Sequence, residues 1–97
     1  MPNCFVRQQW LERVEFAGVI ANGRVFRGKN GRYVTFLTLG IDYGEYIDVT
    51  IQRPFQYRDG DIVTGQGQVR QSNNSDYVQA SDARLWNMRE YVEAARG

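Results

Sequence analysis

The chain has no histidine and a single cysteine, Cys4, among its 97 residues. One thiol without a histidine cannot form an intrachain disulfide, a Cys/His zinc site or a Cys–His catalytic pair. Histidine is also the commonest general base at neutral pH, so its absence argues against an enzyme. We therefore expect a protein of a reducing compartment, with no catalytic activity, no metal, no cofactor and no small-molecule substrate.

Long apolar segments are also missing. The longest uncharged stretches, such as residues 34–41, fall far short of the roughly 20 residues that a transmembrane helix needs. The first ten residues, MPNCFVRQQW, lack the apolar core of a signal peptide. We expect a cytoplasmic protein that does not associate with membranes. Apolar residues make up 42% and charged residues 24% of the chain, which is typical of one small folded domain.

The net charge of +1 hides an uneven distribution. Between Phe16 and Ile41 the chain has no acidic residue and four cations: Arg24, Arg27, Lys29 and Arg32. Lys29 is the only lysine, and arginine is the side chain that forks onto phosphates and stacks on rings. Several of the thirteen aromatic residues adjoin cations, as in Phe26-Arg27, Arg32-Tyr33 and Tyr57-Arg58. Cations interleaved with rings suit a surface that follows a polyanionic strand, although a solvated arginine-rich surface has the same composition.

Alternation of apolar and polar residues predicts a series of short strands. The expected strands begin at Arg13, with bends at Gly18 and Gly23, and continue over residues 32–41, 45–52, 62–71 and 77–86. The run GKNG at 28–31 predicts a turn, because Asn-Gly readily supplies positive φ. Gly65 and Gly67 allow close packing across a small barrel, or a bulge. Asn87 and Glu90 form a capping box for a helix over 88–95, whose apolar side would pack on the barrel or on a second subunit.

The parity of each strand separates core residues from outward-facing rings. In the second strand the face Tyr33, Thr35, Leu37 and Leu39 is the better core candidate, which directs Phe36 outward. In the third strand Ile47, Val49 and Ile51 face inward and Tyr46 faces outward. Phe16 is expected in the core, Trp10 and Trp86 in packing or an interface, and Phe55 and Tyr57 at the bottom of the barrel.

These elements describe an all-β protein, and they fit a five-stranded OB-fold barrel followed by a short C-terminal helix. The expected organisation is an N-terminal extension at 1–11, an OB-fold domain at 12–86 and a C-terminal helix at 87–97. An SH3-like barrel is the main rival, because periodicity alone does not separate the two.

Several segments then resemble one family, the bacterial-type single-stranded-DNA-binding proteins. Residues 12–41, ERVEFAGVIANGRVFRGKNGRYVTFLTLGI, are similar to that family's N-x-V-x-L-x-G-x-L strand and the hairpin N-G-x-x-V-x-x-F/I-x-L-A. EYIDVTIQ is similar to its E-W/F-x-x-V-x-x strand, and RDGDIVTGQGQVR to its K-G-D-x-V-x-V-x-G-x-L-R strand. The likeness covers residues 12–86 in order. It implies binding of single-stranded DNA in replication or recombination.

The departures from this family narrow the expectation. Glu12 replaces an asparagine, Gly65 replaces a β-branched residue, and the helix between the third and fourth strands is reduced to a few residues. The chain ends EYVEAARG, without the family's acidic tail. The resemblance therefore implies DNA binding more than partner recruitment or a tetramer. We expect a compact phage or plasmid version, in the host cytoplasm if phage-encoded, that forms a homodimer.

The resemblance implies that Tyr46 matches a stacking aromatic of the family. Tyr43 and Tyr77 lie near the positions of a second and a third. Together with parity and charge, this predicts sequence-tolerant binding and protection of single-stranded DNA, with bases stacked on rings and cations on phosphates. The predicted nucleic-acid-binding residues are Arg24, Arg27, Lys29, Arg32, Phe36, Tyr43, Tyr46, Arg53, Arg70 and Tyr77.

Three alternatives to single-stranded DNA binding stay open. RNA is a competitor, because a stacking platform does not exclude the 2′-hydroxyl. A primosome-like OB module that binds a protein partner is another. A metal-dependent nuclease is the least favoured, since the acids Asp42, Glu45 and Asp48 would have to supply its metal ligands.

Overall fold

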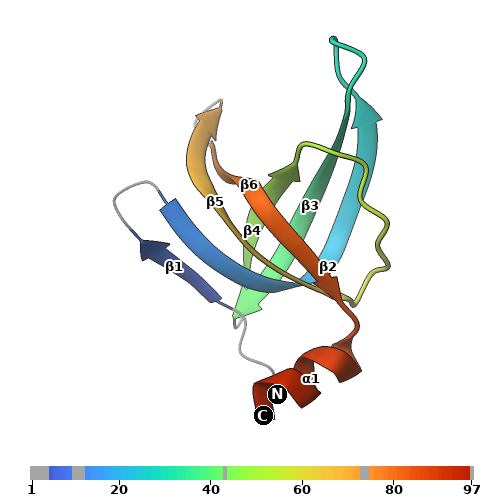
Figure 1. The fold of residues 1–97 in the computed structure, drawn as a ribbon. Helices are drawn as coiled ribbons and strands as arrows, with labels where there is room; N and C mark the ends of the chain where they lie inside the picture. The colour runs from blue at the N-terminus through green and yellow to red at the C-terminus, as the bar shows by residue number, and fades with distance from the viewer. Residues whose placement is uncertain (1–4, 10–12, 43, 73–74, 97) are drawn as a thin grey trace.

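The computed structural model describes residues 5–9, 13–42, 44–72 and 75–96 of the chain, which form six strands and one helix. Figure 1 shows them wound into a barrel with the helix at one end. The elements are β1 (Phe5–Gln9), β2 (Arg13–Arg27), β3 (Tyr33–Asp42), β4 (Glu45–Ile51), β5 (Ile62–Ser72), β6 (Ser75–Trp86) and α1 (Met88–Arg96).

The strands follow the order β1-β2-β3-β4-β6-β5, and β5 returns to pair with β2. This last pairing closes strands β2 to β6 into a barrel. All neighbouring strands run antiparallel except β4 and β6, which are parallel. A five-stranded barrel with this order and one C-terminal helix is the OB fold, as the sequence predicted, and the SH3-like alternative is set aside.

Strand β2 is long enough for its two halves to pair with different strands of the barrel. Its first half, Arg13–Val19, pairs with β5, and its second half, Val19–Arg27, pairs with β3. A register shift between Ile20 and Asn22 marks a bulge, which bends the strand between the two halves. Strand β1 also pairs with the first half of β2, antiparallel over Arg13–Ala17. It lies within residues 1–11, which we expected to be an N-terminal extension.

The barrel is filled by the inward parity of each strand. The side chains with almost no exposure include Phe16, Ile20, Leu37, Leu39, Val49 and Val63. Residues 52–61, all of which are described, contain no helix, as expected. Phe55 from this connection is buried, and Tyr57 packs against the core with its hydroxyl close to Gly23. Both were expected at the bottom of the barrel, and both contact the core cluster.

Tyr33 corrects the prediction from parity. It shares the face of Thr35 and Leu37, which are fully buried, yet Tyr33 is 48% exposed. The reason is that the hairpin of β2 and β3 extends beyond the barrel, as Figure 1 shows, so the alternating pattern continues where there is no core to cover it. The tip of this hairpin is the predicted turn, with Gly31 at φ 80° and a 2.7 Å bond from the Gly28 N–H to the Arg32 carbonyl.

Helix α1 begins at the predicted cap. The Glu90 N–H donates to Asn87 Oδ1 at 2.8 Å, and Asn87 Nδ2 donates to Glu90 Oε1 at 2.6 Å. The helix contacts the barrel through Tyr91, whose ring meets the Trp86 ring edge-on at 6.1 Å between centroids. Trp86 in turn donates its Nε1–H to Thr64 Oγ1 at 2.8 Å, so it is a packing residue as expected. Within the described ranges, no helix has the length and apolarity needed to cross a bilayer.

The predicted role of Gly65 and Gly67 is also confirmed. Both lie on β5 where it passes β6, beside a register shift between the two strands. A Cβ at Gly65 would overlap the Asp82 carbonyl oxygen, and one at Gly67 would overlap the Gln79 carbonyl oxygen. Backbone atoms cannot move aside as a flexible side chain can. These two glycines therefore set how closely β5 and β6 approach.

We expect Gly65→Ala and Gly67→Ala each to lower the free energy of unfolding by about 1–3 kcal/mol or more, because the added methyl overpacks a backbone contact. Gly28→Ala is the matched control. A Cβ there meets no atom closer than 3.4 Å. Urea unfolding of the three variants tests this, and equal stability of Gly65→Ala and Gly28→Ala would contradict the stated role of the close approach.

Candidate nucleic-acid interface

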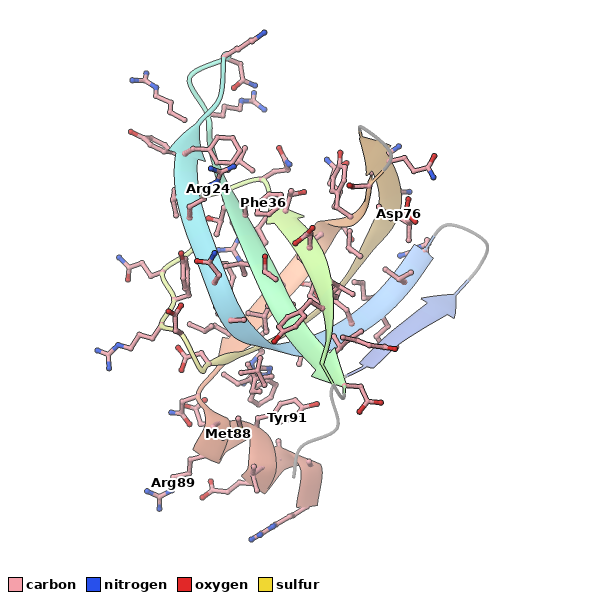
Figure 2. The ribbon with its side chains drawn as sticks, turned by 180° about the vertical axis from the view of Figure 1, so that it is seen from behind. Arg24, Phe36, Asp76, Met88, Arg89 and Tyr91 are labelled. Atoms are coloured by element: carbon pink, nitrogen blue, oxygen red, sulfur yellow. The ribbon has the colours of Figure 1, made fainter. Side chains whose placement is uncertain are left out.

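A groove of about 580 Å³ runs across the outer side of the barrel. It lies between the β2–β3 hairpin and the end of the barrel where β5 turns into β6. In Figure 2 Arg24 and Phe36 lie on one side of this region and Asp76 on the other. We call it the outer groove, and its lining residues are Phe26, Val34, Phe36, Asp48, Thr50, Gln52, Ser75, Asp76, Tyr77 and Gln79.

The outer groove is built by strand parity and register. Phe36, Thr50 and Gln79 are direct neighbours across β3, β4 and β6. On β4 and β6 the flanking residues Val49 and Val78 point into the core, so Asp48 and Tyr77 point outward beside each other. On β3 and β4 the odd positions face the core and the even positions face the groove, and Tyr77 and Gln79 of β6 face the groove, while Asp76 reaches it from the start of β6.

Three rings line the outer groove: Phe26, Phe36 and Tyr77. Phe36 and Tyr77 were predicted as outward-facing stacking residues, and both are half-buried on this face. Phe26, which is 41% exposed, was not singled out from the sequence. It is separated from Phe36 by nine residues in the chain, but β2 and β3 are hydrogen-bonded neighbours, which brings the two rings onto one surface.

Arg24 makes cation–π contacts with two of these rings. Its guanidinium carbon lies 5.6 Å from the centroid of the Phe26 ring and 5.8 Å from that of the Phe36 ring. Such cation–π contacts hold the guanidinium at the edge of the groove, where it also has donors to spare for an anion. The structure therefore brings together Arg24, Phe36 and Tyr77 of the predicted site.

Three predicted cations occupy the tip of the hairpin. Lys29 and Arg32 are exposed, and Arg27 donates its Nε–H to the Gly31 carbonyl at 3.3 Å. They flank the outer groove and do not line it. The tip is thus a positively charged projection next to a hollow with rings.

Arg70 and Arg53 have different surroundings. Arg70 donates to Gln79 Oε1 at 3.2 Å and to Gln68 Oε1 at 2.8 Å, which puts it at the edge of the groove beside Tyr77, its neighbour across β5 and β6. Arg53 donates to the Ala83 carbonyl at 3.3 Å and lies 4.9 Å from the centroid of the Phe55 ring. It is exposed and is not among the groove residues, so its contact with a phosphate stays a prediction.

Of the remaining two predicted rings, the structure describes Tyr46, which is not among the groove residues. Tyr46 is 62% exposed and has the same outward parity as Asp48, two residues further along β4. It packs over Gly40, with its Cε1 atom 3.7 Å from where a Cβ would be. Tyr43 lies outside the described residues. The outer face therefore continues from the groove toward Tyr46.

Sequence reasoning missed the acidic character of the groove. Asp48 and Asp76 line it, and none of the lining residues that the structure describes is a cation. Parity had placed Asp48 outside, but only as a possible metal ligand with Asp42 and Glu45. No group of three or more acids, cysteines or histidines able to hold a metal ion occurs among the residues that the structure describes.

The floor of the groove contains a buried hydroxyl. Thr50 faces the outer side yet is only 9% exposed, and its Oγ1 atom is buried with no hydrogen-bond partner. Thr35, buried on the opposite parity of the adjacent strand, donates its Oγ1–H to the Arg53 carbonyl at 2.9 Å. Burying a hydroxyl without a partner costs free energy, so Thr50 is an unfavourable residue for the free protein.

A second, smaller hollow of about 300 Å³ lies where α1 meets β2, β5 and β6. Glu15, Asp82, Arg84 and Tyr91 are among its lining residues. The Arg84 guanidinium carbon sits 3.7 Å from the Trp86 ring centroid, which holds this cation flat against the indole. This hollow shares no lining residue with the outer groove.

We expect Thr50→Val to raise the free energy of unfolding by about 1 kcal/mol, because it replaces an unpartnered buried hydroxyl with a methyl group. Thr35→Val is the control, and should lower it by about 1–3 kcal/mol, since it removes a hydrogen bond and leaves a carbonyl unpaired. Thermal or urea unfolding of the two variants measures the difference. A loss of stability in Thr50→Val as large as that in Thr35→Val would contradict the assignment.

Comparisons with known proteins support the fold and leave the family open. No protein-family model matches the chain, and no curated protein matches it in sequence. Among solved structures, a chain of the S. pombe Stn1-ten1 complex is similar with a TM-score of 0.66 and 15% sequence identity. The match covers 88% of this chain and 66% of that one, just under two thirds of its length. At this identity the likeness establishes the OB fold that the two chains have in common.

Proposed function

We propose that this protein binds single-stranded DNA in the outer groove, with bases stacked on Phe26, Phe36 and Tyr77. The observation that carries the proposal is the hollow with three rings on the strand face, adjoining a hairpin with three cations at its tip. OB folds carry oligonucleotides on this strand face and its neighbouring loops. The S. pombe likeness supports only the fold on which such a site is built.

The chemistry of the groove favours a single strand over a duplex. Bases in a duplex are stacked on each other and keep their flat faces from protein rings, whereas a single strand can splay its bases into a groove. Each base stacked on an aromatic side chain contributes about 1–3 kcal/mol. Stacking requires no particular sequence, so this part of the binding suits the protection of single strands in replication or recombination.

The cations complete the proposed site from outside the groove. Lys29 and Arg32 at the hairpin tip, Arg24 beside the rings and Arg70 beside Tyr77 lie around the hollow. Phosphates would follow these borders while the bases enter the hollow. Tyr46 extends the same face and would meet a base of a longer strand.

The principal test is a titration with a mixed-sequence DNA oligonucleotide, followed by tyrosine and tryptophan quenching and by gel shift. We expect Phe36→Ala to weaken binding by about 5- to 150-fold, which corresponds to the loss of one stack. Tyr33→Ala is the matched control, because Tyr33 is an exposed ring on the opposite face of the same strand. Absence of binding by the unaltered protein would refute the proposal, and equal effects of the two substitutions would refute the assigned role of Phe36.

A second prediction concerns salt. Each phosphate contact of a single strand contributes about 0.7 to the slope of log K against log salt. We expect the double variant Lys29→Ala and Arg32→Ala to lower this slope by about 1.4. The double variant Arg89→Ala and Arg96→Ala removes the same charge from α1, at the other end of the molecule, and should leave the slope unchanged. Equal slopes for the two double variants would contradict phosphate contacts at the hairpin.

RNA is tested in the same experiment by a parallel titration with the RNA of the same sequence. Aromatic rings line the groove, and such rings stack on the bases of DNA and of RNA. Preference for the RNA strand would move the function to RNA binding on the same face. If the protein is instead a protein-interaction module, we expect no quenching and no gel shift with either strand.

A further inference from the structure

The outer groove has a charge that stacking alone does not explain. Its lining residues include Asp48 and Asp76 and no cation, while the cations lie on its borders. Two carboxylates repel a phosphate from the hollow and attract hydrogen-bond donors into it. In a single strand, the donors that reach a hollow are the N–H groups on the edges of the bases.

The two charged side chains of the groove, Asp48 and Asp76, only accept hydrogen bonds. Asp48 Oδ1 accepts from Thr38 Oγ1 at 3.1 Å, which fixes the orientation of the carboxylate. A carboxylate has about four lone-pair sites, so one such bond leaves most of its capacity available. The other polar side chains that line the groove are hydroxyls and amides, which both donate and accept, so they do not select between base edges: Thr50, Gln52, Ser75, Tyr77 and Gln79.

The unpartnered Thr50 hydroxyl is a second, independent indication of a ligand. Thr50 is more than nine-tenths buried, lies between Phe36 and Gln79 in the cross-strand row of the groove, and has no hydrogen-bond partner for Oγ1. A ligand atom that reaches this floor would pair the hydroxyl. The unpaired hydroxyl is therefore a polar group on the floor of the groove that only a bound molecule would satisfy.

We propose that the outer groove selects bases with an exocyclic amino group, namely cytosine, adenine and guanine, over thymine and uracil. The inference rests on the proposed function and adds a preference to it. Carboxylates accept from the amino group of cytosine, and each good contact of this kind discriminates against a wrong base. Thymine and uracil have one donor on this edge, the N3–H, and it lies between two carbonyl oxygens that a carboxylate repels, whereas cytosine presents N–H donors at position 4. Stacking thus supplies affinity, and the Asp48 and Asp76 carboxylates supply the choice of base.

The sharpest test compares oligodeoxycytidine with oligodeoxyuridine of the same length at neutral pH. Their bases present an amino group and a carbonyl oxygen, respectively, at position 4. The unaltered protein should bind the cytidine strand at least about fivefold more tightly. Equal binding, or tighter binding of the uridine strand, would overturn the inference. Binding of neither strand would overturn the proposed function, so the two failures are distinguishable.

Substitutions then assign the preference to the groove. Asp48→Asn keeps an oxygen to accept the Thr38 bond, so the fold should be retained, but its amide can donate to the uracil oxygen. We expect it to bring the cytidine-to-uridine ratio close to one, with Asp76→Asn acting in the same direction. Asp82→Asn is the matched control, because Asp82 lines the other hollow and should leave the ratio unchanged. A ratio that responds to Asp82→Asn, or to none of the three, would overturn the inference.

Thr50→Val provides a readout that does not depend on charge. It should weaken binding of the cytidine strand while the protein itself becomes no less stable, because the hydroxyl is paired only in the complex. Unchanged affinity for the cytidine strand would remove Thr50 from the proposed contact.

Discussion

The pairing of β2 with β5 is the constraint on which the rest of the molecule depends. It closes the barrel through Phe16 opposite Gly65 and Val14 opposite Gly67, where β5 is pressed against the backbone of β6. Side chains on β5 at these points would force the two strands apart. Because β2 must also reach β3 with its second half, it bulges near Ala21 and continues past the core as a hairpin. The outer groove lies between this projecting β2–β3 hairpin and the strands β4 and β6 of the closed barrel.

The groove combines rings, carboxylates and a bordering set of cations in one small area. This arrangement differs from a uniformly basic surface, which would attract phosphates across its whole width. Here the charge of each sign has its own place: cations at the hairpin and beside Tyr77, acids inside the hollow. A strand that binds such a surface is expected to orient its phosphates outward and its bases inward, so the distribution of charge decides orientation more than total affinity.

Much of the fold followed from local patterns. Alternation located the five barrel strands within a few residues, Asn30-Gly31 marked the hairpin turn, and Asn87 with Glu90 marked the start of α1. The same parity correctly directed Phe36, Tyr46 and Asp48 outward. It did not anticipate β1, and it placed Tyr33 in the core, because an alternating pattern does not reveal where the barrel ends. Arg53 was assigned to phosphates from charge alone, and the contact of its guanidinium with the Ala83 carbonyl could not be read from the sequence.

A period of two residues is a local property, and it is sufficient to state which side of its own strand a residue occupies. It does not specify which residues of other strands will stand next to it. Phe26, Thr50, Asp76 and Gln79 converge on one hollow because of the register between strands and the parallel contact of β4 with β6, both of which arise when the barrel closes. The composition of the outer face was thus readable from the chain, whereas the acidic groove, its rings and its unpartnered hydroxyl exist as a site only through long-range pairing.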